Sequence, residues 1–221
     1  MRIGLFGGTF NPVHTGHLRA ALEVREAFAL DEVHLIPSAV PPHKDPRGIA
    51  PARHRVAMVR AAAGDQEGFV VSDAELRRRG PSYSVDTVAD YRRRLPENGR
   101  LFLIIGGDAF REIHTWKSYR RLFEQVAFIV MVRPGARQRA TAAELEEIGR
   151  CLHRHVDPGY DLQRRGRRFV HDRLQPVAVT EVTRLQISAT RIRALIAEGR
   201  SIRYLVPDAV MDYIRRQGLY R

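Results

Sequence analysis

Two histidines stand close together near the start of the chain, where residues 7–17 read GGTFNPVHTGH. The glycine pair lets the backbone approach a ligand, and the Asn-Pro step turns the chain. If a helix begins beside His14 and His17, its unpaired N–H groups and partial positive charge favour an anion, and the imidazoles add further donors. The order of these residues therefore predicts a phosphate-binding loop.

Two other interpretations of the histidines remain open at this stage. Histidines near a helix start are often packed structurally, and a His-x-x-His spacing can hold a metal ion. Residues 7–17 contain no carboxylate or thiol that would complete a zinc shell, which counts against a protein metal site. The stretch also lacks the Gly-Lys-Ser/Thr of a P-loop and a complete G-x-G-x-x-G.

The elements that must position this loop alternate along the chain. Short apolar runs predict strands at 1–8, 33–39, 69–76, 101–108, 127–135 and 176–182. Helical spacing predicts helices that follow Thr15 and Ser84 as N-caps, and others at 51–63, 188–198 and 207–217. We expect an α/β fold, a Rossmann-like doubly wound, mainly parallel sheet with helices on both faces and a small C-terminal helical part.

Ligands of such sheets bind outside the carboxyl ends of the strands. This rule brings residues 7–17, 37–44, 106–108 and Arg133 to one rim of the predicted sheet. The sequence therefore predicts a single site built from loops that are far apart in the chain.

Length and composition limit the remaining classes. The 221 residues suit a single domain, 1–221, with a peripheral insertion at about 136–175. Within the insertion, residues 141–156 predict an amphipathic helix, and residues 161–173 are basic and weakly patterned. The lone Cys151 excludes an intramolecular disulfide, and no apolar run is long enough for a membrane span, so we expect a cytoplasmic protein. The formal charge of +12 attracts anions, either nucleic acid or nucleotides.

Two motifs carry a resemblance to a known superfamily. HTGH at 14–17 and ISATRIR at 187–193 resemble the H-x-G-H and Ile-Ser-x-Thr-x-Ile-Arg signatures of the nucleotidyltransferases. Further strings resemble bacterial nicotinate-mononucleotide adenylyltransferase: PPHK at 41–44, PSYSVDT at 81–87, GGD at 106–108 followed by Trp116, and VRPG at 132–135. The resemblance covers nearly the whole chain except about 136–175.

The resemblance implies transfer of the adenylyl group of ATP to nicotinate mononucleotide, with pyrophosphate and deamido-NAD as products in NAD biosynthesis. Its implied catalytic residues are His17, His14 and Arg193. The ATP-binding residues it implies are Gly8, Thr9, Phe10, His14, His17, Gly106, Asp108, Ile187, Ser188 and Arg193. For nicotinate mononucleotide it implies Lys44, Tyr83, Ser84, Trp116 and Arg133. Mg²⁺ would be bound through the substrate phosphates, without a dedicated protein metal site.

The sequence departs from the family pattern at Asn11, where Asp is common, and at Ala189, where Ser is common. Two functional alternatives also stay open. The acceptor of the adenylyl group could be nicotinamide mononucleotide or phosphopantetheine, and the positive charge alone would suit a nucleic-acid-binding module. The sequence predicts no membrane partner and leaves a homo-oligomer open.

Overall fold

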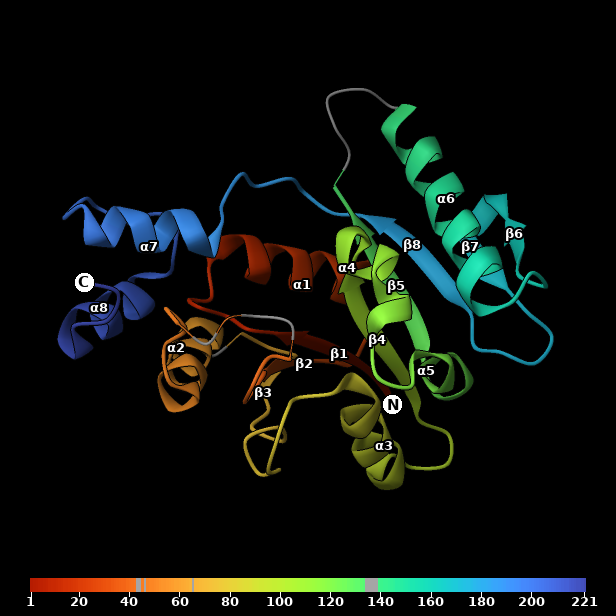
Figure 1. Ribbon diagram of the computed structural model, residues 1–221, viewed down its shortest axis with the longest axis horizontal. Helices are drawn as coiled ribbons and strands as arrows, with labels where there is room; N and C mark the ends of the chain where they lie inside the picture. The colour runs from red at the N-terminus through yellow and green to blue at the C-terminus, as the bar shows by residue number, and fades with distance from the viewer. Residues whose placement is uncertain (43–44, 46, 65, 134–138) are drawn as a thin grey trace.

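The strands of the chain form one continuous sheet. The computed structural model describes residues 1–42, 45, 47–64, 66–133 and 139–221, and within them eight strands lie in the order β3-β2-β1-β4-β5-β8-β7-β6 (Figure 1). The first six in this order pair in parallel, and β7 and β6 add an antiparallel edge. The strands are β1 (Arg2–Gly8), β2 (Glu32–Pro37), β3 (Phe69–Val71), β4 (Arg100–Gly106), β5 (Ala127–Val132), β6 (Asp161–Gln163), β7 (Arg168–Val170) and β8 (Val177–Glu181).

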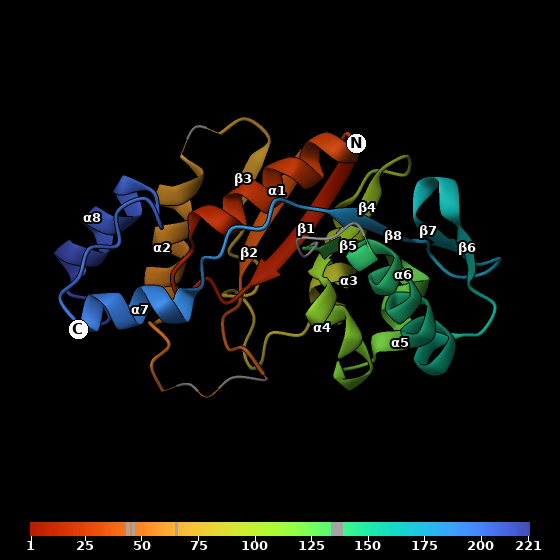
Figure 2. The same cartoon turned by 90° about the horizontal axis from the view of Figure 1, so that it is seen from above.

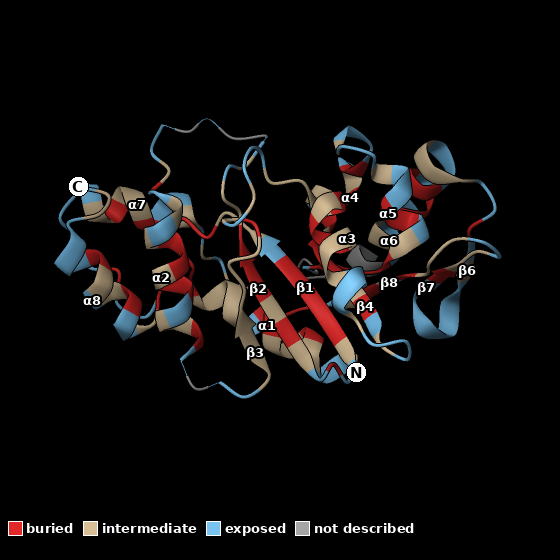
Figure 3. Cartoon of the chain, turned by 90° about the horizontal axis from the view of Figure 1, so that it is seen from below, coloured by how far each residue is buried: buried red, intermediate tan, exposed pale blue. Residues whose placement is uncertain are grey.

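Helices cover both faces of the sheet, which confirms the predicted fold class. The helices α3 (Ser84–Arg94), α4 (Gly107–Arg111), α5 (Tyr119–Gln125) and α6 (Arg139–Cys151) pack on one face. The other face carries α1 (Thr15–Ala27), α2 (Ala52–Ala63), α7 (Ala189–Ala197) and α8 (Asp208–Gln217), and Figure 2 shows the two layers from above. The central strands β1 and β2 are largely buried between the layers (Figure 3).

Several predicted boundaries differ from the structure. The strand expected at 69–76 stops at Val71, because the amide of Ser72 makes the last bond to β2, at Leu35 O, and Leu76 N turns back to Asp73 O. The strand expected at 101–108 ends at Gly106, since Gly107 begins α4.

Two of the predicted helix caps were wrong. Thr15 and Ser84 are the first residues of α1 and α3, and the extended N-cap residues are His14 and Tyr83. A histidine takes the cap position of α1 because its own amide is satisfied by the imidazole of His17, one turn into the helix. In α7, by contrast, Ser188 is the N-cap, and its hydroxyl accepts a hydrogen bond from Arg191 N at 3.2 Å.

The segment expected as an insertion extends the sheet and contributes to its core. It contains α6, a π-helical turn at Leu152–Val156, and the β6–β7 hairpin, which pairs with β8 at the edge of the sheet. Ile148, Tyr160 and Phe169 from this segment are buried in the same cluster as Phe123 and Phe128. The basic, weakly patterned stretch therefore holds a two-stranded ribbon that the sequence did not indicate.

Candidate active site

Two cavities open side by side at the carboxyl ends of the parallel strands, and Thr9 lines both of them. The first, the polar cavity, has a volume of about 610 Å³ and lies between the β1–α1 loop and the start of α7. The second, the apolar cavity, has a volume of about 310 Å³ and lies between β1, β4 and the start of α3. The predicted rim is therefore confirmed, and it consists of two compartments with a shared wall.

His14 and His17 lie in the polar cavity as a stacked pair. Their ring centroids are 3.6 Å apart and the ring planes differ by 25°. A Cβ atom at Gly16 would come within 3.1 Å of the His14 ring, so a side chain at that position would displace this ring. The glycine of the HTGH string is thus explained by the packing of the imidazole before it.

The tautomer of His17 follows from its backbone contact. The amide of His14 donates to Nδ1 of His17 at 3.2 Å, so Nδ1 acts as the acceptor and the neutral ring carries its proton on Nε2. Phe10, which is only 2% exposed, packs edge-on against the His17 ring with 5.1 Å between the centroids. The ring orientation of His17 is therefore fixed from two sides.

His14 is buried, and its surroundings disfavour a positive charge on its own ring. Removal from water, and to a lesser extent the neighbouring Arg133, lowers the pKa of His14 to about 4. Its Nδ1 is buried and has no hydrogen-bond partner among the described residues. His14 therefore contributes a neutral polar ring to the wall of the polar cavity, where burial and Arg133 oppose a positive charge on it.

The far end of the chain closes the polar cavity. Arg193 from α7 donates through Nη1 to the carbonyl of Asn11 at 2.9 Å, which joins the two sequence motifs directly. Ile187 and the cap residue Ser188 line the same cavity, as do Asp108 from the first turn of α4 and Arg133 after β5. Three positively polarised groups, the α1 start, the α7 start and Arg193, thus converge on one space.

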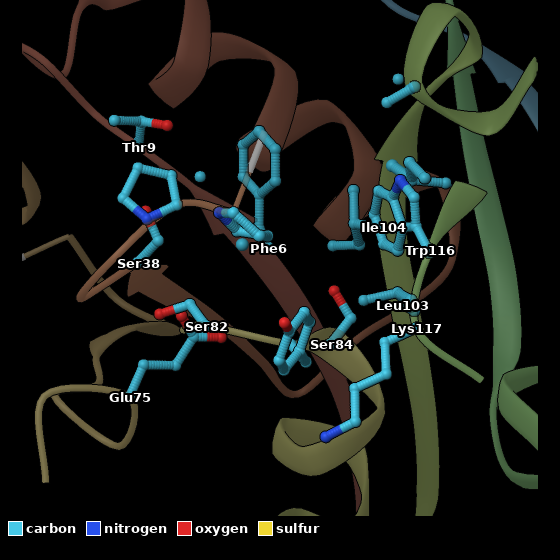
Figure 4. Close-up of a pocket in the computed structure, with 18 residues that line it drawn as sticks. Phe6, Thr9, Ser38, Glu75, Ser82, Ser84, Leu103, Ile104, Trp116 and Lys117 are labelled. Carbon is cyan, nitrogen blue, oxygen red and sulfur yellow. The ribbon is translucent and has the colours of Figure 1, made fainter. Parts of the chain in front are cut away.

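The apolar cavity collects most of the residues expected to bind the mononucleotide. Tyr83, Ser84 and Trp116 line it, and Figure 4 shows Ser84 and Trp116 with Leu103 and Ile104 from β4 nearby. Lys117 places its ammonium 4.5 Å from the centre of the Tyr83 ring and 3.3 Å from a carboxylate oxygen of Asp86. An aromatic and aliphatic wall beside a helix N-terminus can hold a flat ring that carries a negative charge.

Three predicted residues line the other cavity from the one that their expected ligand would occupy. Gly8 and Gly106, expected beside ATP, line the apolar cavity, because β1 and β4 end there before the chain turns toward the polar cavity. Arg133, expected beside the mononucleotide, lies in the polar cavity near His14. Lys44 lies outside the described residues.

The most deeply buried polar side chain of the site was missed by the sequence reasoning. Arg55 on α2 is 1% exposed and donates to three backbone carbonyls, those of Ala50, Thr9 and Ala39, at 2.9, 2.8 and 3.0 Å. Thr9 belongs to the β1–α1 loop, and Ala39 and Ala50 lie near the two ends of the β2–α2 connection. Both loops contribute residues to the two cavities. The signal was an arginine at helical spacing within the buried face of α2, next to Val56 and one turn before Val59.

Asn11 is a second hub that the sequence did not reveal. Its Oδ1 accepts from Ala50 N at 3.0 Å and from the Tyr220 hydroxyl at 2.7 Å, and its Nδ2 donates to Gly48 O at 2.9 Å. An aspartate at this position could accept the first two bonds but could not donate to Gly48. The departure from the family pattern therefore adds an anchor for the loop that lines the polar cavity.

The described residues contain no group of three or more His, Cys, Asp or Glu side chains that could hold a metal ion. Cys151 and His153 point to separate partners, since the thiol contacts Phe110 O and the imidazole contacts Tyr160 O. Among the helices that the structure describes, none is long and apolar enough to cross a membrane.

Comparison with known proteins agrees with this geometry. Residues 5–195 match the cytidylyltransferase-like family model. The chain is 44% identical to a protein of Desulfatibacillum aliphaticivorans over the full length of both, and 43% identical to one of Pseudomonas fluorescens that it covers to 97%. Both relatives are named "Probable nicotinate-nucleotide adenylyltransferase".

A solved structure shares the fold at low sequence identity. The nicotinic acid mononucleotide adenylyltransferase of Plasmodium falciparum complexed with NaAD superposes with a TM-score of 0.71 at 16% identity, over 99% of this chain and 97% of that one. The parallel sheet, the joined histidine and ISATRIR motifs and the full-length relatives lead to one assignment. The chain belongs to the cytidylyltransferase-like family and, within it, to the nicotinate-nucleotide adenylyltransferases.

Proposed function

We propose that this enzyme binds the triphosphate of ATP in the polar cavity and nicotinate mononucleotide in the apolar cavity, and joins them where the cavities meet. The observation that carries this proposal is the shared wall at Thr9, with His14 and His17 on its polar side and Trp116 and Ser84 on its apolar side. A phosphate attached to a ring in the apolar cavity would enter the polar cavity beside the histidines.

In the reaction, an oxygen of the mononucleotide phosphate attacks the α-phosphorus of ATP in line with the departing pyrophosphate. One P–O bond forms to the acceptor, one P–O bond to the β-phosphate breaks, and the electron pair of that bond leaves with pyrophosphate. The step needs no covalent enzyme intermediate, so the work of the protein is to position the reactants and to stabilise charge on the equatorial oxygens.

His17 is the residue we assign to the transition state. Its Nε2–H, fixed by the contact from His14 N to Nδ1, would donate to an oxygen on the α-phosphorus as negative charge builds there. His14 would contact the triphosphate beside it, and the anion would favour protonation of a ring that burial otherwise keeps neutral. Loss of one preorganised donor of this kind costs about 10²–10³ in rate.

The remaining polar groups hold the substrates. Arg193 and the N-terminus of α7 with Ser188 would grip the β- and γ-phosphates, and Asp108 would accept from a ribose hydroxyl of the adenosine. Arg133, beside His14 in the polar cavity, would contact the phosphate of the mononucleotide at the point where it meets ATP. Thr9, Phe10 and Ile187 complete the walls around the nucleotide.

In the apolar cavity, the indole of Trp116 would stack on the pyridine ring. The backbone N–H groups at the start of α3, beginning at Tyr83 and Ser84, would face its carboxylate, because the first N–H groups of a helix lack partners within it.

The donor set of the polar cavity fits Mg²⁺ that arrives with the nucleotide. Its carboxylates are Asp108 and Asp45, which are hard oxygen ligands of the kind that Mg²⁺ prefers, and Asp45 is already paired with Arg47. Two such ligands leave most of the coordination to phosphate oxygens and water. Bound in this way, the ion would neutralise charge on the triphosphate.

Since both substrates are phosphorylated metabolites of the cell interior, we also place the enzyme in the cytoplasm.

The test is release of pyrophosphate by the purified protein with ATP, Mg²⁺ and nicotinate mononucleotide. We expect turnover that falls about 10²–10³-fold in His17→Ala, with circular dichroism and melting temperature close to the wild type. Nicotinamide mononucleotide and phosphopantetheine are the acceptors to measure in parallel. A higher kcat/KM with either of them would overturn the proposed acceptor, and full activity of His17→Ala would overturn the mechanism.

A further inference from the structure

A third cavity lies at the opposite edge of the sheet from the active site, where the parallel strands begin. Its volume is about 370 Å³, and four arginines line it, together with the rings of Phe28 and Phe102. The arginines are Arg2, Arg92, Arg100 and Arg168. No carboxylate is found among the described residues that line this cavity, so its charge is strongly positive.

The register of the sheet explains how the arginines come together. Arg2 on β1 pairs with Arg100 on β4, and Arg168 on β7 pairs with Ala178 on β8. The pairings across β5 place Arg2, Arg100 and Arg168 on the face that carries α1, whereas Arg92 comes from α3 on the other face. Ala127 and Ala178 lie between the arginines as small residues, and Figure 2 shows α1 over β1, away from β8 and β7.

Two guanidinium groups at directly paired positions of neighbouring strands repel each other. The structure provides little compensation from the protein. Arg2 donates to the carbonyl of Phe28 and Arg92 to that of Gln125, each at 3.0 Å. Arg100 and Arg168 form no ion pair with any described residue.

Unsatisfied polar atoms point to a ligand independently of the charge. The Nε of Arg2 and the Oε1 of Gln125 are both buried without a hydrogen-bond partner among the described residues, and both residues line this cavity. Buried polar groups are nearly always hydrogen-bonded, so the unpaired donor Nε–H of Arg2 indicates a missing acceptor, which a phosphate oxygen would supply. The Oε1 of Gln125 is itself an acceptor and would take no bond from a phosphate oxygen. The guanidinium of Arg2 also lies 5.1 Å from the centre of the Phe102 ring.

We propose that this arginine cavity is a binding site for a small ligand with a chain of phosphate groups, separate from the active site. A phosphate chain would bring together the like charges of Arg2 and Arg100 and reach Arg168 across the two alanines. Planar guanidinium groups bind phosphate oxygens in pairs, which gives such a site geometric selectivity as well as charge. The aromatic rings provide a wall for the non-phosphate part of a nucleotide.

The probe is inorganic tripolyphosphate, titrated by isothermal calorimetry at fixed ionic strength. We expect the wild type to bind it at the arginine cavity in addition to any binding at the active site. The double variant R100Q/R168Q should lose that component, with Kd at least about tenfold weaker. Its kcat/KM for each substrate, measured with the other substrate saturating, should stay within about twofold of the wild type, because neither residue lies at the active site. A parallel titration with ATP distinguishes a free polyphosphate from a nucleotide.

The matched control is R164Q/R165Q, which removes the same charge from two exposed arginines outside the cavity. It should retain both binding components. The inference is overturned if R100Q/R168Q binds tripolyphosphate like the wild type, or if R164Q/R165Q loses as much affinity as R100Q/R168Q. Failure of the proposed catalytic function would leave this outcome unchanged, since the readout is the component that R100Q/R168Q removes.

Discussion

Replacement of Arg55 by methionine tests whether one buried side chain holds the active-site loops together. The variant R55M keeps the length of the side chain and removes the donors to Thr9 O, Ala39 O and Ala50 O. Each hydrogen bond to a charged donor contributes about 1.5–3 kcal/mol. The cost of burying the charged guanidinium must be subtracted from this sum. The same loss of hydration lowers the pKa of Arg55. That cost is about several kcal/mol.

The net expectation for R55M is a loss of about 3–5 kcal/mol in the free energy of unfolding, since three buried carbonyls lose their partners. In a chain of this size such a loss lowers the melting temperature by about 10 °C. Urea unfolding gives the free energy, and pyrophosphate release gives kcat/KM for both substrates. Because Thr9 lines both cavities and the β2–α2 connection contributes residues to each of them, KM should rise for ATP and for the mononucleotide together.

The matched control is R53M, which changes an exposed arginine two residues away on the same helix. It should alter the free energy of unfolding by about 0.5 kcal/mol or less. The reasoning is refuted if R55M and R53M have the same free energy of unfolding and the same KM values. The three hydrogen bonds would then contribute nothing to stability or to substrate binding.

Three further predictions concern single groups of the site. The pKa of His14 is about 4 in the folded chain and about 6.5 in the unfolded chain, so its contribution should lower the free energy of unfolding by about 3 kcal/mol as the pH is lowered from 6.5 to 4. Urea unfolding at each pH measures this loss, and His14→Gln should remove that contribution. Tyr220→Phe removes the hydroxyl bond to Asn11 and should cost about 1 kcal/mol and raise KM for ATP, whereas Tyr213→Phe, which loses a bond outside the site, should leave KM unchanged. Trp116 is the sole tryptophan, so nicotinate mononucleotide should change the protein fluorescence directly, and Trp116→Ala should raise KM for that substrate about two- to tenfold with little change for ATP.

Local chemistry determined a large part of this protein. The alternation of apolar runs with helical spacing predicts a parallel sheet, and the rule that ligands bind at the carboxyl ends of its strands places Thr9, Asp108 and Arg133 at one rim. The HTGH and ISATRIR strings were sufficient to indicate the family. These features depend on residue type and short-range order, which a sequence displays directly.

Contacts between distant residues decided the rest. The partition of the rim into a polar and an apolar cavity, the roles of Arg55 and Asn11, and the contact of Tyr220 with the first loop all join positions that only folding brings together. The arginine cavity is of the same kind, since Arg2, Arg100 and Arg168 become neighbours through strand register, and register depends on the pairing of whole strands. A sequence records which side chains are present, and the tertiary structure determines which of their charges and hydrogen-bonding groups are left to be satisfied by one another or by a ligand.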